Sequence, residues 1–279
     1  MRSNEYRVLS NEAQYTQPSL LRTQYSLLTM NRLRIIVFIA LAVAQAAAQN
    51  LGTSPTQTVI NFYRALKQKH YVEGFHHSVY RAAVEGLSPG ELKDLEPDFS
   101  KTFAAIPDKI EPRDEQIDRD TAVVKLKFEG MESAQEVALI RVGGEWLVGD
   151  QETLTLVRAQ GRSFFFNARI LVNETEAVEM LQRVIGAEII YSQKFEGRCA
   201  SLQELIKLGG VPKDIEDQGG AYKFSFSLAA DKKSFFATAT PSTYGRSGRR
   251  SFYADLNGIR GEDLKGKLAS ASSPVYVPQ

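Results

Sequence analysis

NETEAVEMLQRVIGAEIIYSQKF, residues 173–195, is the stretch around which the C-terminal half of the chain is organised. Asn173 followed three residues later by Glu176 has the spacing of a capping box, which predicts that a helix begins here. A helix with one broad apolar face needs a partner surface, which the segment after it must supply. The residues that share this face are Ala177, Val178, Met180, Leu181, Val184, Ile185, Ala187, Tyr191 and Phe195.

A small antiparallel sheet is predicted to cover that face. A turn at Gly197-Arg198-Cys199 and then a short amphipathic helix within SLQELIKLGGVP, residues 201–212, come first. Apolar and polar residues then alternate, as they do along half-buried strands. The apolar run 164–172 is interpreted as an approach to the long helix, with a helix reaching back through it as the alternative. The strand residues are Tyr222, Phe224 and Phe226, then 235–239, then 251–256 with the hairpin pair Asn257-Gly258.

The preceding half of the chain begins with helices. Ser54-Pro55 and Ser88-Pro89 each place a capping serine before a proline, which is the pattern of a helix start. Residues 71–80 predict a further helix between these two. Because proline removes a helical hydrogen bond, the helix after Ser88 is expected to be interrupted at Pro97.

Strands follow the helices in this half. Gly143-Gly144 is the two-residue turn of a hairpin within them. Helices followed by an antiparallel meander indicate the α+β class, with domains at 50–158 and 163–270 that the short polar segment RAQGRS joins closely. The alternating sets are Val124, Leu126 and Phe128, then Val137, Leu139 and Arg141, then Trp146 and Val148.

Composition gives few further constraints on function. The chain has 279 residues and a formal net charge of +1, so no global field favours nucleic acid or an anionic membrane. The single cysteine, Cys199, excludes an intramolecular disulfide and a cysteine-only metal site. In an exported protein it leaves a free thiol or an intermolecular bridge.

Residues 30–48 have the features of a secretory signal peptide. Two arginines precede an apolar run from Ile35 to Ala44, and small residues follow it up to Ala48, after which cleavage is expected. Residues 1–29 are polar and are expected to be disordered or not translated, with translation starting at Met30. The alternative is an uncleaved membrane anchor. Both interpretations place the remainder outside the cytoplasm, in the periplasm or the medium, and cleavage would leave no stable membrane span.

The segment 50–158 resembles the nuclear transport factor 2-like family, with its cystatin-like cone, found in many exported bacterial proteins. The resemblance rests on TQTVINFYRALKQKHYVEGFHHSVY and on the strand series that ends in GGEWLVGD. It implies a curved sheet folded over helices around a conical pocket, which Tyr63 and Trp146 are expected to line. Some members of the family carry an acid-base site in this pocket, and many others bind ligands or partners.

The candidate acid-base groups of this half are His70, His77 and Asp150. His70, Glu73 and His77 are spaced by three and four residues, which on a continuous helix would place them on one face as metal ligands or a proton-transfer pair. The plain alternative is a polar helix surface. Asp150 and Glu152 follow the tryptophan strand, and a solvated turn is the alternative for both.

The segment from Ser163 to Gly261 resembles the globular domain of type IV pilin-like and pseudopilin proteins. The resemblance rests on the long helix, SLQEL, GGAYKFSF, ATATPSTYG and GRRSFYADLNGIRG. Pilins begin with a cleaved leader and a long apolar assembly helix, and here a folded domain stands in their place. This departure disfavours a filament subunit.

Three polar features of the second half have alternative interpretations. Asp255, Asn257 and Asp263 would match a calcium loop of some pseudopilins, and a plain hairpin turn is the alternative. The basic loop with Arg246, Arg249 and Arg250 would bind a phosphate or an acidic partner, or else is solvated. Glu188 falls on the apolar face of the long helix and is expected to be paired, for example with Arg198, or else to reach the edge of the helix.

The sequence as a whole predicts an exported, non-catalytic protein for binding or envelope assembly. The alternative is a small-molecule binder or a cofactor-free enzyme of the isomerase or hydratase type, with His70, His77 or Asp150 as its acid-base groups. No cofactor is expected apart from the calcium alternative. The expected partner is a small molecule or an envelope protein, not a nucleic acid, and an oligomer is possible.

Overall fold

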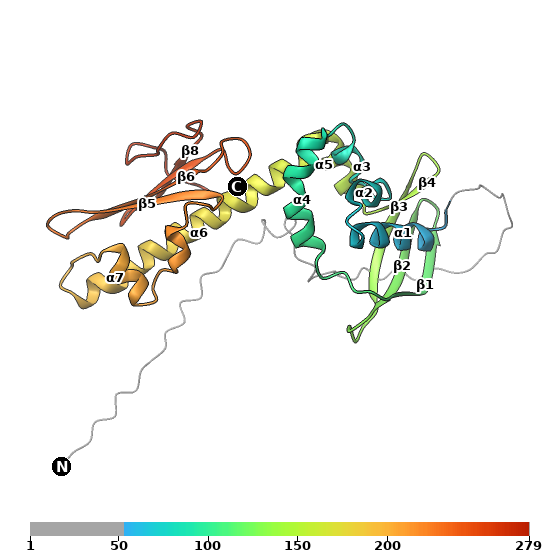
Figure 1. Cartoon of the computed structure of the whole chain (residues 1–279), viewed down its shortest axis with the longest axis horizontal. Coiled ribbons are helices and arrows are strands. Elements are labelled where there is room, and N and C mark those ends of the chain that lie inside the picture. Colours follow the sequence, from blue (N-terminus) through green and yellow to red (C-terminus); the bar gives the residue numbers. More distant parts are fainter. Residues whose placement is uncertain (1–52, 279) are drawn as a thin grey trace, which may run out of the picture. The chain divides into compact units, whose positions relative to one another are not determined.

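The computed structural model describes residues 53–278. The predicted signal peptide at 30–48 and the segment 1–29 lie outside the described residues. Within the described part, no helix is both long enough and apolar enough to cross a membrane. The described elements form two four-stranded antiparallel sheets with helices around each, which confirms the α+β class (Figure 1).

The first sheet has the strand order β1-β2-β3-β4 and follows four helices along the chain. On β2, every second residue from Ala122 to Phe128 is buried, and α1 packs on this face through Val59. The predicted Gly143-Gly144 hairpin turn is confirmed, with φ values of 60° and 88°. The elements are α1 (Pro55–Lys67), α2 (Tyr71–His76), α3 (Arg81–Val84), α4 (Pro89–Phe103), β1 (Ile110–Asp118), β2 (Thr121–Phe128), β3 (Gln135–Val142), β4 (Glu145–Val148) and α5 (Gln151–Gln160).

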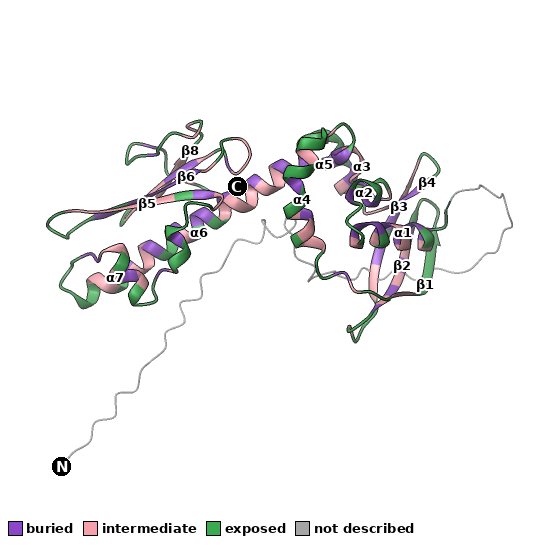
Figure 2. Cartoon of the chain, viewed as in Figure 1, coloured by how far each residue is buried: buried purple, intermediate pink, exposed green. Residues whose placement is uncertain are grey.

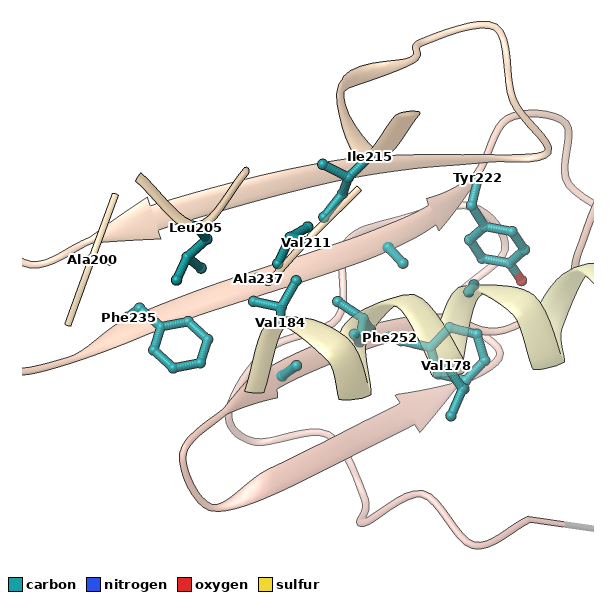
Figure 3. Close-up of a cluster of buried hydrophobic side chains, with 14 of the residues drawn as sticks. Val178, Val184, Ala200, Leu205, Val211, Ile215, Tyr222, Phe235, Ala237 and Phe252 are labelled. Carbon is teal, nitrogen blue, oxygen red and sulfur yellow. The ribbon is translucent and has the colours of Figure 1, made fainter. Parts of the chain in front are cut away.

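The second sheet has the order β5-β6-β7-β8 and packs on the long helix α6 (Phe164–Lys194). Figure 3 shows Val178 and Val184 of α6 among the sheet residues Tyr222, Ala237 and Phe252. The remaining elements are η1 (Gly161–Ser163), α7 (Leu202–Lys207), η2 (Lys213–Glu216), β5 (Tyr222–Leu228), β6 (Phe235–Pro241), β7 (Ser251–Asp255) and β8 (Gly258–Glu262).

The expected interruption at Pro97 is wrong. Ser88 caps α4 as predicted, and Glu91 completes the capping box, but the helix continues through Pro97 to Phe103. The residues two positions before and after the proline, Leu95 and Phe99, are buried in the first hydrophobic core. Tertiary packing of these side chains offsets the hydrogen bond that the proline cannot make.

The predicted start of the long helix at Asn173 is also wrong, and the alternative, a helix that reaches back through residues 164–172, is confirmed. Helix α6 begins at Phe164, and Asn173 lies in its interior with Nδ2 donating to the Ser247 carbonyl oxygen at 2.8 Å. The reason is that three apolar side chains of the run before Asn173 are buried: Phe164 and Phe166 belong to cores of the first half, and Ile170 is buried as well. The single helix α6 therefore contributes buried side chains to the cores of both halves, and buried positions occur along its length (Figure 2).

Three elements of the first half were not predicted: helix α3, strand β1 and helix α5. Strand β1 is almost entirely exposed and has a bulge between Pro112 and Asp114, so its sequence lacks an apolar alternation. Helix α5 begins after Asp150 and replaces the expected solvated turn. The segment between the halves is consequently shorter than RAQGRS, because only Gly161–Ser163 separate α5 from α6.

Candidate functional site

The interior of the first half is a packed apolar core. The side chains between α1 and the first sheet are buried aliphatic and aromatic groups, and Trp146 is one of them at 8% exposure. Tyr63 packs edge-on against Phe128 with ring centroids 5.4 Å apart, and burial raises the pKa of its hydroxyl to about 12. Tyr63 and Trp146 are thus close to the same core, where they fill space between α1 and the sheet.

The histidine candidates His70 and His77 flank helix α2, and Glu73 of this helix lies near both. His70 precedes α2, and its Nδ1 lies 3.4 Å from Glu73 Oε2 in an exposed pair. His77 follows α2, and its backbone carbonyl accepts the Val148 N–H at 2.9 Å, which ties the end of α2 to β4. Burial lowers the pKa of His77, and the charge of Glu73 opposes that shift. Helix α2 runs from Tyr71 to His76, so His70 and His77 are its cap residues and Glu73 lies in its first turn.

Asp150 is the N-cap of α5. Its carboxylate accepts the Thr153 N–H at 2.7 Å and the Thr153 hydroxyl at 3.1 Å. Glu152 lies in the first turn of the same helix and is exposed. The Asp150 carboxylate therefore has a local structural role that its position after the tryptophan strand did not predict.

Tyr80 is a partly buried residue with a buried hydroxyl group, and the sequence analysis did not select it. Its ring packs between Phe75 and Phe164, with centroid distances of 6.0 and 5.5 Å. Its hydroxyl is buried and has no hydrogen-bond partner within the described part of the chain. Burial raises the pKa of Tyr80, and the negative charge of Asp150 adds to this shift. Its only signal in the sequence is aromatic, and aromatic residues are common in cores.

The calcium candidates do not come together. Asp255 is at the tight turn between β7 and β8, where its carboxylate accepts the Asn257 N–H at 2.7 Å. Asp263 is beyond the other end of β8 and accepts from Tyr244 Oη at 3.2 Å. The five residues of β8, Gly258–Glu262, lie between Asn257 and Asp263, and this length of extended chain is about 16 Å. Residues 53–278 contain no group of three or more acidic, histidine or cysteine side chains that could hold a metal ion.

The basic loop, residues 243–250, is bound to helix α6 by the buried carboxylate of Glu174. Oε1 of Glu174 accepts the backbone N–H groups of Arg249 and Arg250 at 2.9 and 3.0 Å, and Oε2 accepts from Arg250 Nε at 2.7 Å. Arg249 also donates to Asn167 Oδ1 at 2.9 Å. The loop is neither freely solvated nor open to a phosphate at these groups, because its acidic partner belongs to the same chain.

A polar hollow of about 260 Å³ lies beside this loop, and we call it the arginine hollow. Arg246 lies over the Phe166 ring at 4.1 Å, and Glu91 lies 3.2 Å from Arg162 and 3.7 Å from Arg246. The pKa of Glu91 is lowered, mainly by its hydrogen bonds with Ser88. Guanidinium groups bind carboxylates through charge-assisted hydrogen bonds, so this arrangement has the chemistry of a carboxylate site.

Glu188 is the second buried carboxyl group of α6. It is 0% exposed, its Oε2 accepts the Ala200 N–H at 2.9 Å, and its Oε1 has no partner in the described residues. Burial raises its pKa. The expected pairing with Arg198 is not observed, since its one hydrogen-bond donor is the backbone of the loop before α7.

Comparison with family models, curated proteins and solved structures found no match to this chain. The geometry above is therefore the basis for any functional proposal. The resemblance of the two halves to nuclear transport factor 2-like and pilin-like domains stays a prediction.

Proposed function

We propose that the protein is an exported, non-catalytic binding or envelope-assembly protein. The observation that carries this proposal is the packed interior of the first half, where Trp146, Phe128 and Leu126 are buried between α1 and the first sheet. A conical pocket with an acid-base site needs open volume beside its polar groups. The candidate groups instead have local partners, as Asp150 has in the cap of α5.

Binding would then use the outer surface of the molecule. The arginine hollow favours a partner with an accessible carboxylate or phosphate, because Arg162 and Arg246 already hold Glu91 there. Arg162 is exposed at 64% of its side chain, so that it is free to reorient toward a partner. A protein surface rich in Asp or Glu has the matching chemistry.

Fractionation of cells that express the whole chain tests this function. We expect the protein in the soluble envelope fraction or the medium, with an intact mass that corresponds to a start near Gln49. A chain that keeps residues 35–44 and stays in the membrane fraction would contradict cleaved export. Crosslinking of the same material tests binding. We expect Arg162→Glu and Arg246→Glu to weaken the capture of a partner. The control variant Arg158→Glu, which changes an exposed surface residue, should still capture it.

The second candidate is a small-molecule binder or a cofactor-free enzyme. The observation that favours it is the unpartnered hydroxyl of Tyr80, whose pKa is raised further by the charge of Asp150. Native mass spectrometry of the protein purified from cells distinguishes the two candidates. A retained small molecule that Tyr80→Phe releases would support this second function, whereas an unliganded mass for both proteins supports the first.

A further inference from the structure

The outer edge of strand β5 has free backbone hydrogen-bonding groups. Ser242 N donates to Ala221 O at 3.0 Å, and Ala229 N donates to Ser234 O at 2.9 Å. These two bonds determine which residues of β5 direct their backbone groups toward β6 and which direct them away. The N–H and C=O groups of every second residue, Lys223, Ser225 and Ser227, therefore point toward β6. Those of Phe224, Phe226 and Leu228 point away from β6, and no partner for them is found in residues 53–278.

The other three sheet edges of the described chain are protected. Strand β1 has a bulge at Pro112 and charged side chains along its length. Strand β4 is joined to the loop after α2, where Val79 N donates to Val148 O at 3.0 Å. Strand β8 is covered by the C-terminal segment, because Tyr276 N donates to Ile259 O at 2.9 Å. Unprotected edges pair with other strands, so β5 stands out as the edge open to addition.

A hollow of about 290 Å³ accompanies this edge. It lies between β5 and the segment around η2, and its apolar lining includes Phe224, Phe226, Leu202 and Ile215. Strand β5 has no proline and a single charge, that of Lys223. An added strand would thus gain backbone hydrogen bonds at the edge and a recess for its apolar side chains.

We propose that the occupant of this edge is the β5 strand of a second copy, paired antiparallel about a two-fold axis at Phe226. In this register Phe226 faces its own copy and Phe224 faces Leu228 of the second copy, so that the outward backbone groups bond to each other. Lys223 faces Ala229 of the second copy, and no like charges meet along the strand. The apolar side chains of each strand reach the hollow of the other.

The charges at the two ends of β5 support this antiparallel pairing. Before the strand lie Asp214, Glu216 and Asp217 with one lysine, Lys213, and after it lie Lys232 and Lys233 with one aspartate, Asp231. Antiparallel pairing puts the acidic end of each copy next to the basic turn of the other. Opposite charges in these positions select the antiparallel orientation over a parallel one.

Sedimentation velocity across protein concentrations tests the dimer, with protein from cells expressing the whole chain and its N-terminus defined by mass. One pair of edge strands with a small apolar recess is a small interface, and we expect such a dimer to dissociate in roughly the micromolar range. Phe226→Glu, which places two carboxylates face to face, is expected to weaken dimerisation about tenfold or more. Phe236→Glu is the matched control, since Phe236 is an exposed aromatic residue of the interior strand β6. A monomer at every concentration would overturn the proposal.

A charge exchange tests the orientation without changing a packed side chain. Glu216→Lys is expected to weaken dimerisation about threefold to tenfold, and Lys233→Glu in the same chain is expected to restore it. Glu216 and Lys233 are both exposed, so thermal unfolding of these variants should match that of the parent. Weakening by Glu216→Lys that Lys233→Glu leaves unrestored would contradict the antiparallel register.

Hydrogen exchange tests which backbone groups take part. The amides of Phe224, Phe226 and Leu228 should exchange about tenfold more slowly at high than at low protein concentration, while those of Ser225 and Ser227 are protected at both. Protection of the outward amides that is independent of concentration would mean that the chain covers its own edge, and this would overturn the proposal. The pairing uses the second sheet alone, so its failure would leave the proposed export and binding function standing, and fractionation results do not affect it.

Discussion

Glu174 and Arg250 form an ion pair, 2.7 Å between Nε and Oε2, in which the glutamate side chain is 4% exposed and the arginine side chain 21%. The same carboxylate accepts two backbone N–H groups of the basic loop. The hydrogen bonds from these three donors offset the free energy that it costs to remove the carboxylate from water. The pair therefore fixes the loop between β6 and β7 on helix α6.

Glu174→Gln should lower the free energy of unfolding by about 2 kcal/mol, because the amide removes the charge and turns a donor toward backbone N–H groups. Urea denaturation followed by circular dichroism measures this loss. Glu176→Gln is the control, since Glu176 lies two residues away on α6 and is exposed, and its effect should stay within about 0.5 kcal/mol. Equal effects of the two substitutions would show that the Glu174 contacts do not stabilise the fold.

Glu188 should make the protein less stable as the pH rises. Its folded pKa is raised by burial, so the folded state holds this proton more tightly than the unfolded state does. The stabilisation is complete below the unfolded pKa, at about 4, and is lost as the pH increases toward the raised folded pKa. The substitution Glu188→Gln should therefore raise the free energy of unfolding by roughly 1 kcal/mol at pH 8, and should leave it almost unchanged at pH 4.

The control for this pH dependence is Glu179→Gln, which changes an exposed glutamate of the same helix. Unfolding by urea at several pH values gives the slope of the free energy of unfolding against pH for each protein. A parent and a Glu188→Gln protein with the same dependence on pH would exclude Glu188 as the titrating group.

Cys199 should react slowly with thiol reagents in the folded protein. The side chain is 1% exposed, and burial together with the charges of Glu188 and Asp231 raises the pKa of its thiol. Labelling by a disulfide reagent should accelerate at least about a hundredfold in urea, because it requires local opening of the fold. The variant Ala134→Cys, at an exposed loop position, supplies a fast-reacting thiol in the same molecule. Rapid labelling of native Cys199 would instead favour the intermolecular bridge.

The sequence predicted the elements whose signals are local. The serines before Pro55 and Pro89 mark the helix starts that the structure has, and the alternation from Val124 to Phe128 identifies a buried strand face. The predicted start of α6 was wrong because Asn173 and Glu176 have the spacing of a capping box. In the structure the Asn173 side chain instead donates a hydrogen bond to the carbonyl oxygen of the distant Ser247. Local spacing carries no information about such a partner.

The candidate site was less predictable than the fold for the same reason. The acidic residue that binds the basic loop, Glu174, is adjacent in sequence to the false cap and 76 residues from Arg250. The open edge of β5 follows from the order of strands in the sheet, which the alternation of Phe224 and Phe226 does not specify. Only the tertiary structure brings these groups together.

Gly149→Ala should be strongly destabilising, because glycine is needed there for two separate reasons. Gly149 has φ 128°, which L residues rarely adopt, and an added Cβ would lie 2.5 Å from Val79 Cγ2. Backbone strain and the steric overlap together should cost about 3 kcal/mol or more. Gly130→Ala isolates the backbone contribution, since Gly130 has φ 80° and open space around it, and should cost about 1 kcal/mol.

A double-mutant cycle separates the two causes at Gly149. Val79→Ala removes both Cγ atoms that the new methyl group would meet, so Gly149→Ala should cost less in the Val79→Ala background than in the parent. The coupling energy should be roughly 1 kcal/mol or more in favour of the double variant. Additive free energies of unfolding would show that only the backbone conformation requires glycine. The contact of Gly149 with Val79 would then play no part in holding the segment after α2 against the end of β4.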